Sequence, residues 1–144
     1  MRFELNGLRG SIVALVTPMD GLASPYTPID EASIKGLIDF HVESQTRAIV
    51  VVGTTGESAT LTAEEHCDMI AKVVAEVDGR IPVIAGTGSN STHEALFLTK
   101  EAKARGADAA LIVTPYYNRP TQKGLFEHHK IIANEVNLPQ ILYN

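Results

Sequence analysis

Apolar runs and helical stripes alternate along the chain, and this alternation predicts its elements. Five runs rich in Val, Ile, Leu and Ala are each followed by polar or glycine-rich residues. After four of them, apolar residues recur every three or four positions, which is the spacing of one helix face. Continuous apolar runs are typical of strands buried on both faces of a parallel sheet. The predicted strands are residues 11–19, 48–52, 81–86, 109–115 and 139–143.

Capping residues mark the starts of four predicted helices between these strands. Asp30 is a favourable N-cap for the first, and Thr62 with Glu65 makes the capping-box pattern of the second. Thr92 and Thr121 are predicted to cap the third and the fourth. A strand, a polar loop and a helix therefore form a unit of roughly thirty residues, which recurs four and a half times.

The strand ends decide between two architectures for this α/β chain. Strict alternation of strands and helices gives a parallel sheet, either doubly wound or rolled into a (β/α)8 barrel. A doubly wound sheet carries its site at one switch point, whereas a barrel uses the carboxyl ends of all its strands. Here every predicted strand has a polar end: Thr17, Thr54-Thr55, Thr87, Thr114-Tyr116-Tyr117 and Tyr143-Asn144. We therefore expect a (β/α)8 TIM barrel.

The length indicates a partial barrel. A complete barrel takes about 250 residues, and the chain has 144. We expect residues 1–144 to be the N-terminal part of a single TIM-barrel domain, supplying its first four and a half β/α units. The alternative is a small doubly wound protein that is complete in itself. It needs residues 139–143 as an edge strand, and that run is too apolar to favour it.

Composition and charge argue against several classes of function. The formal net charge is −5 without any basic run, which disfavours a nucleic-acid surface or an anionic membrane as partner. The single cysteine, Cys67, rules out an internal disulfide framework and fits a reducing compartment. The first residues lack a signal-peptide core, and no apolar run reaches the roughly 20 residues of a membrane-spanning helix. We expect a cytoplasmic location.

The most distinctive polar stretch follows the second predicted strand. Thr54 and Thr55, between Gly53 and Gly56, offer hydroxyls and backbone N–H groups just before a helix. Such a group suits a small carboxylate, which interacts favourably with the amides and the helix dipole. A tight strand-to-helix turn with capping threonines explains the same residues equally well.

Tyrosines at strand ends are the second candidate group. A phenol can pass a proton along a hydrogen-bonded chain, although a tyrosine at a rim can also simply pack its ring. Three tyrosines, Tyr116, Tyr117 and Tyr143, follow strands, and their convergence with Thr54 favours the chemical role.

Other segments give weaker signals. Residues 86–91 lack the third glycine of a dinucleotide fingerprint, and His128-His129 point apart on one helix. Residues 64–67 have no zinc spacing and are interpreted as a solvated first helical turn, with Cys67 as a small buried apolar residue. We expect no metal and no cofactor. Every lysine falls on a predicted helix or helix start, so amine-based covalent catalysis lacks an obvious nucleophile here.

Three motifs together resemble one enzyme family. They are Gly53-Thr54-Thr55-Gly56-Glu57-Ser58-Ala59-Thr60-Leu61, Val113-Thr114-Pro115-Tyr116-Tyr117-Asn118-Arg119-Pro120 and Leu138-Pro139-Gln140-Ile141-Leu142-Tyr143-Asn144. From about Leu8 onward the chain resembles the dihydrodipicolinate synthase (4-hydroxy-tetrahydrodipicolinate synthase) family of pyruvate-dependent lyases. The likeness covers the first half of the family's barrel.

The resemblance implies a lyase of lysine biosynthesis through diaminopimelate. Such an enzyme condenses pyruvate, held as a Schiff base on a lysine, with L-aspartate 4-semialdehyde, and it forms a homotetramer as a dimer of dimers. The family's Schiff-base lysine lies on the sixth strand and its substrate-binding arginine follows the fifth, beyond the residues present. We therefore expect this chain to be inactive alone.

The resemblance also implies roles for individual residues. Thr54, Tyr117 and Tyr143 match the family's proton-relay trio, with Tyr117 reaching into the neighbouring subunit's site, and Thr55 matches the position that binds the pyruvate carboxylate. Ala63 stands where some members of the family have a histidine. The positions that bind the inhibitor lysine match Ser58, Ala59, His66, Gly88, Asn90, Glu94 and Tyr116.

Two alternative functions remain at this stage. One is another pyruvate-dependent aldolase of the same family, acting on N-acetylneuraminate or a 2-keto-3-deoxy sugar acid. The other is a non-catalytic half-barrel that binds lysine.

Overall fold

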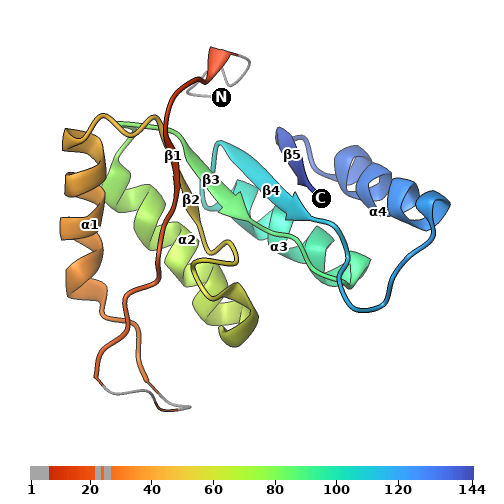
Figure 1. Cartoon of the computed structure of the whole chain (residues 1–144), viewed down its shortest axis with the longest axis horizontal. Helices are drawn as coiled ribbons and strands as arrows, with labels where there is room; N and C mark the ends of the chain where they lie inside the picture. Colours follow the sequence, from red (N-terminus) through yellow and green to blue (C-terminus); the bar gives the residue numbers. More distant parts are fainter. Residues whose placement is uncertain (1–6, 22–23, 25–26) are drawn as a thin grey trace.

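Strands and helices alternate along the whole described chain. The structure, a computed structural model, describes residues 7–21, 24 and 27–144 (Figure 1). The strands are β1 (Ile12–Ala14), β2 (Ala48–Val51), β3 (Val83–Gly86), β4 (Ala109–Val113) and β5 (Gln140–Tyr143). The helices are α1 (Glu31–Glu43), α2 (Ala63–Val77), α3 (Thr92–Ala104) and α4 (Gln122–Glu135), with a short 3-10 helix η2 (Ser58–Thr60) before α2.

The sheet has the strand order of a barrel. Its order is β1-β2-β3-β4-β5, and every neighbouring pair is parallel. Consecutive helices lie side by side from α1 to α4 (Figure 1). A doubly wound sheet reverses its strand order at a switch point, and this sheet does not. The doubly wound alternative is therefore wrong, and the described chain forms the first part of a TIM barrel.

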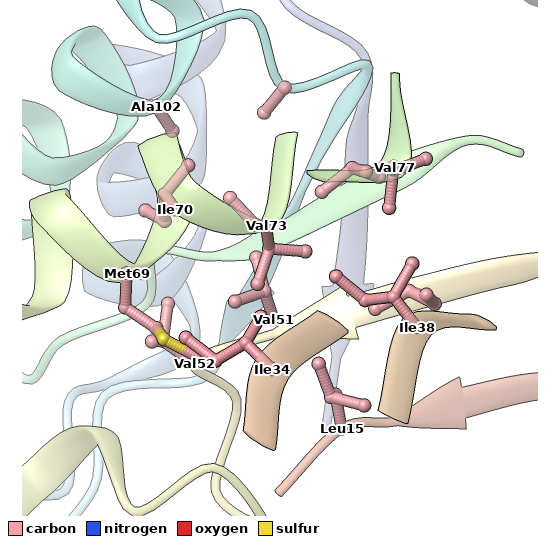
Figure 2. Close-up of a cluster of buried hydrophobic side chains, with 14 residues drawn as sticks. Leu15, Ile34, Ile38, Val51, Val52, Met69, Ile70, Val73, Val77 and Ala102 are labelled. Carbon is pink, nitrogen blue, oxygen red and sulfur yellow. The ribbon is translucent and has the colours of Figure 1, made fainter. Parts of the chain in front are cut away.

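Alternate residues of the strands pack on opposite faces of the sheet. One face of the sheet packs against the apolar faces of α1 and α2, and Figure 2 shows this cluster. The strand residues in it are Ile49, Val51, Val83 and Ala85. Ala48, Val50, Ile84 and Ala109 form a second cluster with Leu8 and Leu111 on the other face. All four residues of β2 are buried, as its continuous apolar run predicts.

Most predicted helix starts are confirmed, and one is displaced by a residue. Asp30, Thr62 and Thr121 cap α1, α2 and α4, and Thr62 forms the predicted capping box. Ser91, and not Thr92, caps α3 by accepting the backbone N–H of Glu94 at 3.4 Å. Thr92 is the first helical residue, and its hydroxyl instead contacts His128 Nδ1 at 2.9 Å. The Thr92 hydroxyl, which the sequence predicted to cap α3, therefore contacts a residue of α4 instead.

Several strands are shorter than predicted, because proline and turning backbone limit the ladder. β1 contains three residues of the predicted range 11–19, and beyond it only Leu15 continues the pairing, through its N–H to the Val50 carbonyl at 2.9 Å. Between β1 and α1, residues 22–23 and 25–26 lie outside the described residues. None of the helices in the described part of the chain is both long and apolar enough to cross a membrane.

Candidate functional site

A compact turn carries the two threonines beyond β2. The N–H groups of Gly56 and Glu57 donate to the carbonyls of Gly53 and Thr54, both at 3.0 Å. A Cβ at Gly56 would lie 3.1 Å from the Leu15 carbonyl oxygen and from Val52 Cα, so glycine permits the turn to fold back on the strand ends. The turn leaves the side chains of Thr54 and Thr55 exposed while Gly56 is buried.

The backbone entering this turn is strained. Val52 has φ +47° and is 1% exposed. Left-handed backbone is unfavourable for a β-branched residue, and it persists only where surrounding packing enforces it. The helix expected directly after the turn begins only at Ala63, since η2 comes first. The macrodipole of α2 acts within its own first turn, so it does not explain anion binding at Thr54 and Thr55.

The first cavity lies at the carboxyl ends of the strands, where TIM barrels carry their sites. It has a volume of about 220 Å³, and Thr54, Thr55 and Tyr143 line it. Its floor is apolar and comes from Val50, Leu111 and other residues of the strands. Drug-sized ligands occupy pockets of about 300–1,000 Å³. A smaller space with two hydroxyls and a phenol therefore suits a small polar molecule.

The three candidate tyrosines do not converge within one chain. Tyr143 lines the first cavity, and its carbonyl accepts the N–H of Thr114 at 2.8 Å. Tyr117 is 95% exposed and lines neither this cavity nor the next. Tyr116 lines the second cavity, and the backbone of the next residue, Tyr117, is left-handed (φ +69°). The expected convergence of all three with Thr54 is thus wrong for a single chain.

A second cavity of about 160 Å³ lies beside the first. Asn90 is the one inhibitor candidate that does not line it; the Asn90 carbonyl accepts Asn118 Nδ2 at 3.0 Å. Sequence reasoning missed Ser89, which is 2% exposed and also lines the cavity. The only signal in the sequence for this role of Ser89 was its position just before α3. The candidates that do line the cavity are Ser58, Ala59, His66, Gly88, Glu94 and Tyr116.

His66 gives the second cavity a neutral imidazole. The ring is 4% exposed, and its Nε2–H donates to the Gly86 carbonyl at 2.8 Å. Burial lowers the pKa of His66, partly offset by this carbonyl and by Glu94. With Nε2 protonated, Nδ1 carries the lone pair. The interpretation of residues 64–67 as a solvated turn is wrong for His66, because that face of α2 packs against the end of β3.

Glu94 adds a carboxylate to the same cavity. The Ser89 hydroxyl donates to Glu94 Oε2 and accepts the backbone N–H of Ser91 at 3.1 Å. An ionised carboxylate can only accept, so the direction of the Ser89 hydrogen bond is fixed. A carboxylate and an imidazole lone pair in one cavity suit an ammonium group.

Two glycines bring the cavities together. A Cβ at Gly86 would lie 2.5 Å from the Val52 carbonyl oxygen, and one at Gly88 would lie 2.4 Å from the Val113 backbone nitrogen. Only glycine allows the end of β3 and the segment after it to approach Val52 and Val113 this closely. Gly88 and Ser58 line both cavities, which therefore share a wall.

Other candidates lie away from the cavities. The lysines are on helices, Lys35 in α1, Lys72 in α2, Lys100 and Lys103 in α3, and Lys123 and Lys130 in α4, as predicted. Cys67 is 2% exposed, which confirms it as buried, and burial raises the pKa of its thiol. Within residues 7–21, 24 and 27–144, His, Cys, Asp and Glu side chains form no cluster that could hold a metal ion.

Comparisons with known proteins agree with this geometry. The model of the Dihydrodipicolinate synthetase family matches residues 7–144. A 4-hydroxy-tetrahydrodipicolinate synthase from Pseudomonas savastanoi is 61% identical over 137 residues, 95% of this chain and 46% of that protein. The chain spans about half the length of the curated relatives it matches.

Two solved structures share the fold and carry relevant ligands. The dihydrodipicolinate synthase of Acinetobacter baumannii, complexed with pyruvate, is 55% identical with a TM-score of 0.89, over 95% of this chain and 46% of that one. The enzyme of Cyanidioschyzon merolae, with lysine bound, is 42% identical with a TM-score of 0.87, over 95% and 46% of the two chains.

Proposed function

The chain belongs to the dihydrodipicolinate synthetase family, and from this membership we propose that it supplies the first part of a 4-hydroxy-tetrahydrodipicolinate synthase. The proposed reaction, of the lyase class, condenses pyruvate with L-aspartate 4-semialdehyde in lysine biosynthesis through diaminopimelate. The observation that carries the proposal is the cavity that brings Thr54, Thr55 and Tyr143 together at the strand ends. Curated relatives with this activity and the pyruvate complex of the A. baumannii enzyme support it.

Thr55 binds the pyruvate carboxylate in this proposal. Its side chain is exposed at the tip of a turn that internal hydrogen bonds already hold, so little ordering is needed on binding. Thr54 and Tyr143 line the same cavity and pass a proton between the keto acid and solvent. The apolar floor of the cavity strengthens these hydrogen bonds by lowering the local dielectric.

Tyr117 completes the relay from another subunit. A tyrosine that is 95% exposed and held by left-handed backbone contributes little packing to its own chain. A role in a neighbouring subunit accounts for this exposure, and it makes the protein a homo-oligomer, a dimer of dimers by family likeness. Its location is the cytoplasm, where the substrates of amino-acid biosynthesis are made.

The amine that captures pyruvate lies outside these 144 residues. Each lysine here is on a helix, and ion pairs engage several of them, such as Lys72 with Glu31 and Lys100 with Glu135. An exposed, charged ammonium is a poor nucleophile. The 144-residue chain alone is therefore inactive. Treatment with pyruvate and borohydride followed by peptide mapping tests this, and an adduct on any lysine of this chain contradicts it.

The second cavity binds lysine as a feedback inhibitor. Glu94 and the Nδ1 of His66 accept hydrogen bonds from an ammonium group, while Tyr116 and Ser58 offer further polar contacts. The lysine complex of the C. merolae enzyme supports this role. Ala63 lines the cavity where some family members have histidine, so this chain lacks one imidazole that could contact the ligand.

A lysine-binding module without catalysis is the second candidate. The candidate residues of the second cavity all belong to this chain, whereas the capturing amine does not. Calorimetry of the 144-residue chain with lysine distinguishes the two: heat without turnover of pyruvate by the complete gene product favours the module.

A substitution at Thr55 tests the main proposal. In the protein expressed from its complete gene, Thr55→Val is expected to raise the KM for pyruvate by roughly tenfold, the effect of one lost hydrogen bond to a charged group. Thr60→Val is the control, because the Thr60 hydroxyl donates to the Glu57 carbonyl at 2.9 Å and lines neither cavity. An unchanged KM in Thr55→Val, or consumption of a sugar acid in place of aspartate semialdehyde, contradicts the proposal.

A further inference from the structure

Thr17 lies outside both cavities and still contacts the turn between them. It follows β1, is 4% exposed, and lines neither cavity. Its hydroxyl donates to the Gly56 carbonyl at 2.7 Å, across 39 positions of the sequence. Gly56 is itself buried, so its carbonyl has Thr17 as a partner in a place where an unpaired carbonyl is costly.

The turn that Thr17 holds belongs to both cavities. Thr54 and Thr55, before Gly56, line the first cavity, and Ala59, after it, lines the second. Ser58 lines both. A shift of the turn at Gly56 therefore moves the walls of the two cavities together.

The remaining bonds of the turn do not fix it to β1. The N–H of Gly56 donates to Gly53, and that of Glu57 donates to Thr54, so both stay within the turn. Against the segment after β1, Gly56 has the hydrogen bond from Thr17 and close packing on the Leu15 carbonyl. Packing limits the approach of the turn, whereas a hydrogen bond also fixes its direction.

We propose that Thr17 is a positioning residue that sets the geometry of both cavities through the Gly56 carbonyl. The inference rests on the proposed function for the identity of the two ligands, pyruvate and lysine. Removing the hydroxyl leaves the carbonyl without its donor, and the turn shifts to reach water. Thr55 and Ser58 move with it, so affinity for the substrate and for the inhibitor falls in one step.

The test compares three variants of the complete gene product. Thr17→Val keeps the shape and removes the donor, and Thr17→Ser keeps the donor. Thr46→Val is the matched control, since Thr46 is also buried, at the opposite end of β2, and its hydroxyl contacts His41 Nδ1 at 3.2 Å. Thr17→Val is expected to raise both the KM for pyruvate and the lysine concentration for half inhibition by roughly tenfold. Thr17→Ser is expected to keep the KM and the half-inhibition concentration at the values of the parent protein, and Thr46→Val is expected to change neither.

Hydrogen exchange gives a readout that needs no activity. The amides of residues 56–58 are expected to exchange faster in Thr17→Val than in the parent protein, and at the parent rate in Thr46→Val. Absence of pyruvate turnover contradicts the proposed function, while the exchange rates still decide whether Thr17 holds the turn. Unchanged exchange, or a change in only one of the two constants, overturns the inference.

A third substitution at Thr17 covers the case in which Thr17→Val does not fold. Thr17→Cys places a weak donor at the same position. Intermediate increases in both constants are expected, and values equal to those of the parent protein overturn the inference.

Discussion

Replacing Gly88 by alanine measures how closely the segment after β3 must approach β4. A Cβ at this position lies 2.4 Å from the Val113 backbone nitrogen and 2.6 Å from Val113 Cγ1. The side-chain contact can relax by rotation, but the backbone nitrogen follows only if the strand moves. Overpacking in a close-packed region costs about 1–3 kcal/mol. Because the nearest atom is backbone, we expect the free energy of unfolding to fall by about 3 kcal/mol.

Urea unfolding followed by circular dichroism checks this value against a matched glycine. Gly36 lies within α1, and nothing is within 4 Å of a Cβ placed there. Gly36→Ala is therefore expected to raise the free energy of unfolding by about 0.5–1 kcal/mol, since alanine loses less entropy in a helix. The two substitutions should thus have opposite signs. Surface substitutions usually change the free energy of unfolding by less than about 0.5 kcal/mol. If Gly88→Ala changes it by no more than that, the steric argument is refuted.

Three other predictions use the same unfolding measurement. Thr62→Ala removes the N-cap of α2 and should lower stability by about 1 kcal/mol; an unchanged midpoint speaks against the cap. Asp78→Gly, at the left-handed C-cap of α2 (φ +46°), should raise stability by about 0.5–1 kcal/mol, and a loss contradicts this. Burial lowers the pKa of His66, so the unfolded chain binds more protons and stability falls as pH drops below 6.5 through the folded pKa. His66→Gln should reduce that slope, and an unaltered pH profile excludes His66 as its source.

Local signals in the sequence predicted most of the elements. The apolar run of β2 has no polar alternation, and the structure buries it on both faces. The capping box of Thr62 and Glu65 needs only residues that are three positions apart, with hydrogen bonds of 2.8 and 3.2 Å between them. The capping box succeeds as a signal because its hydrogen bonds form within one turn of the chain, and the apolar run succeeds because its composition indicates burial on both faces.

The candidate site was predicted in part. Thr54, Thr55 and Tyr143 share a cavity, as motifs at strand ends suggested. Tyr116 lines the second cavity, whereas its neighbour Tyr117 is 95% exposed and lines neither cavity. His66 resembles a residue of a solvated helix start, and only the position of β3 makes its ring buried.

By itself, the sequence determined the α/β alternation, the caps of α1, α2 and α4, and the polar strand ends, because these follow from periodicity and from groups a few residues apart. The tertiary structure alone decided that Thr92 contacts α4 and does not cap α3, that Ser89 lines the second cavity, and that Thr17 reaches Gly56. These features depend on residues that are far apart in the chain. Their free energy appears only when the strands and helices are packed against one another, so no local pattern records it.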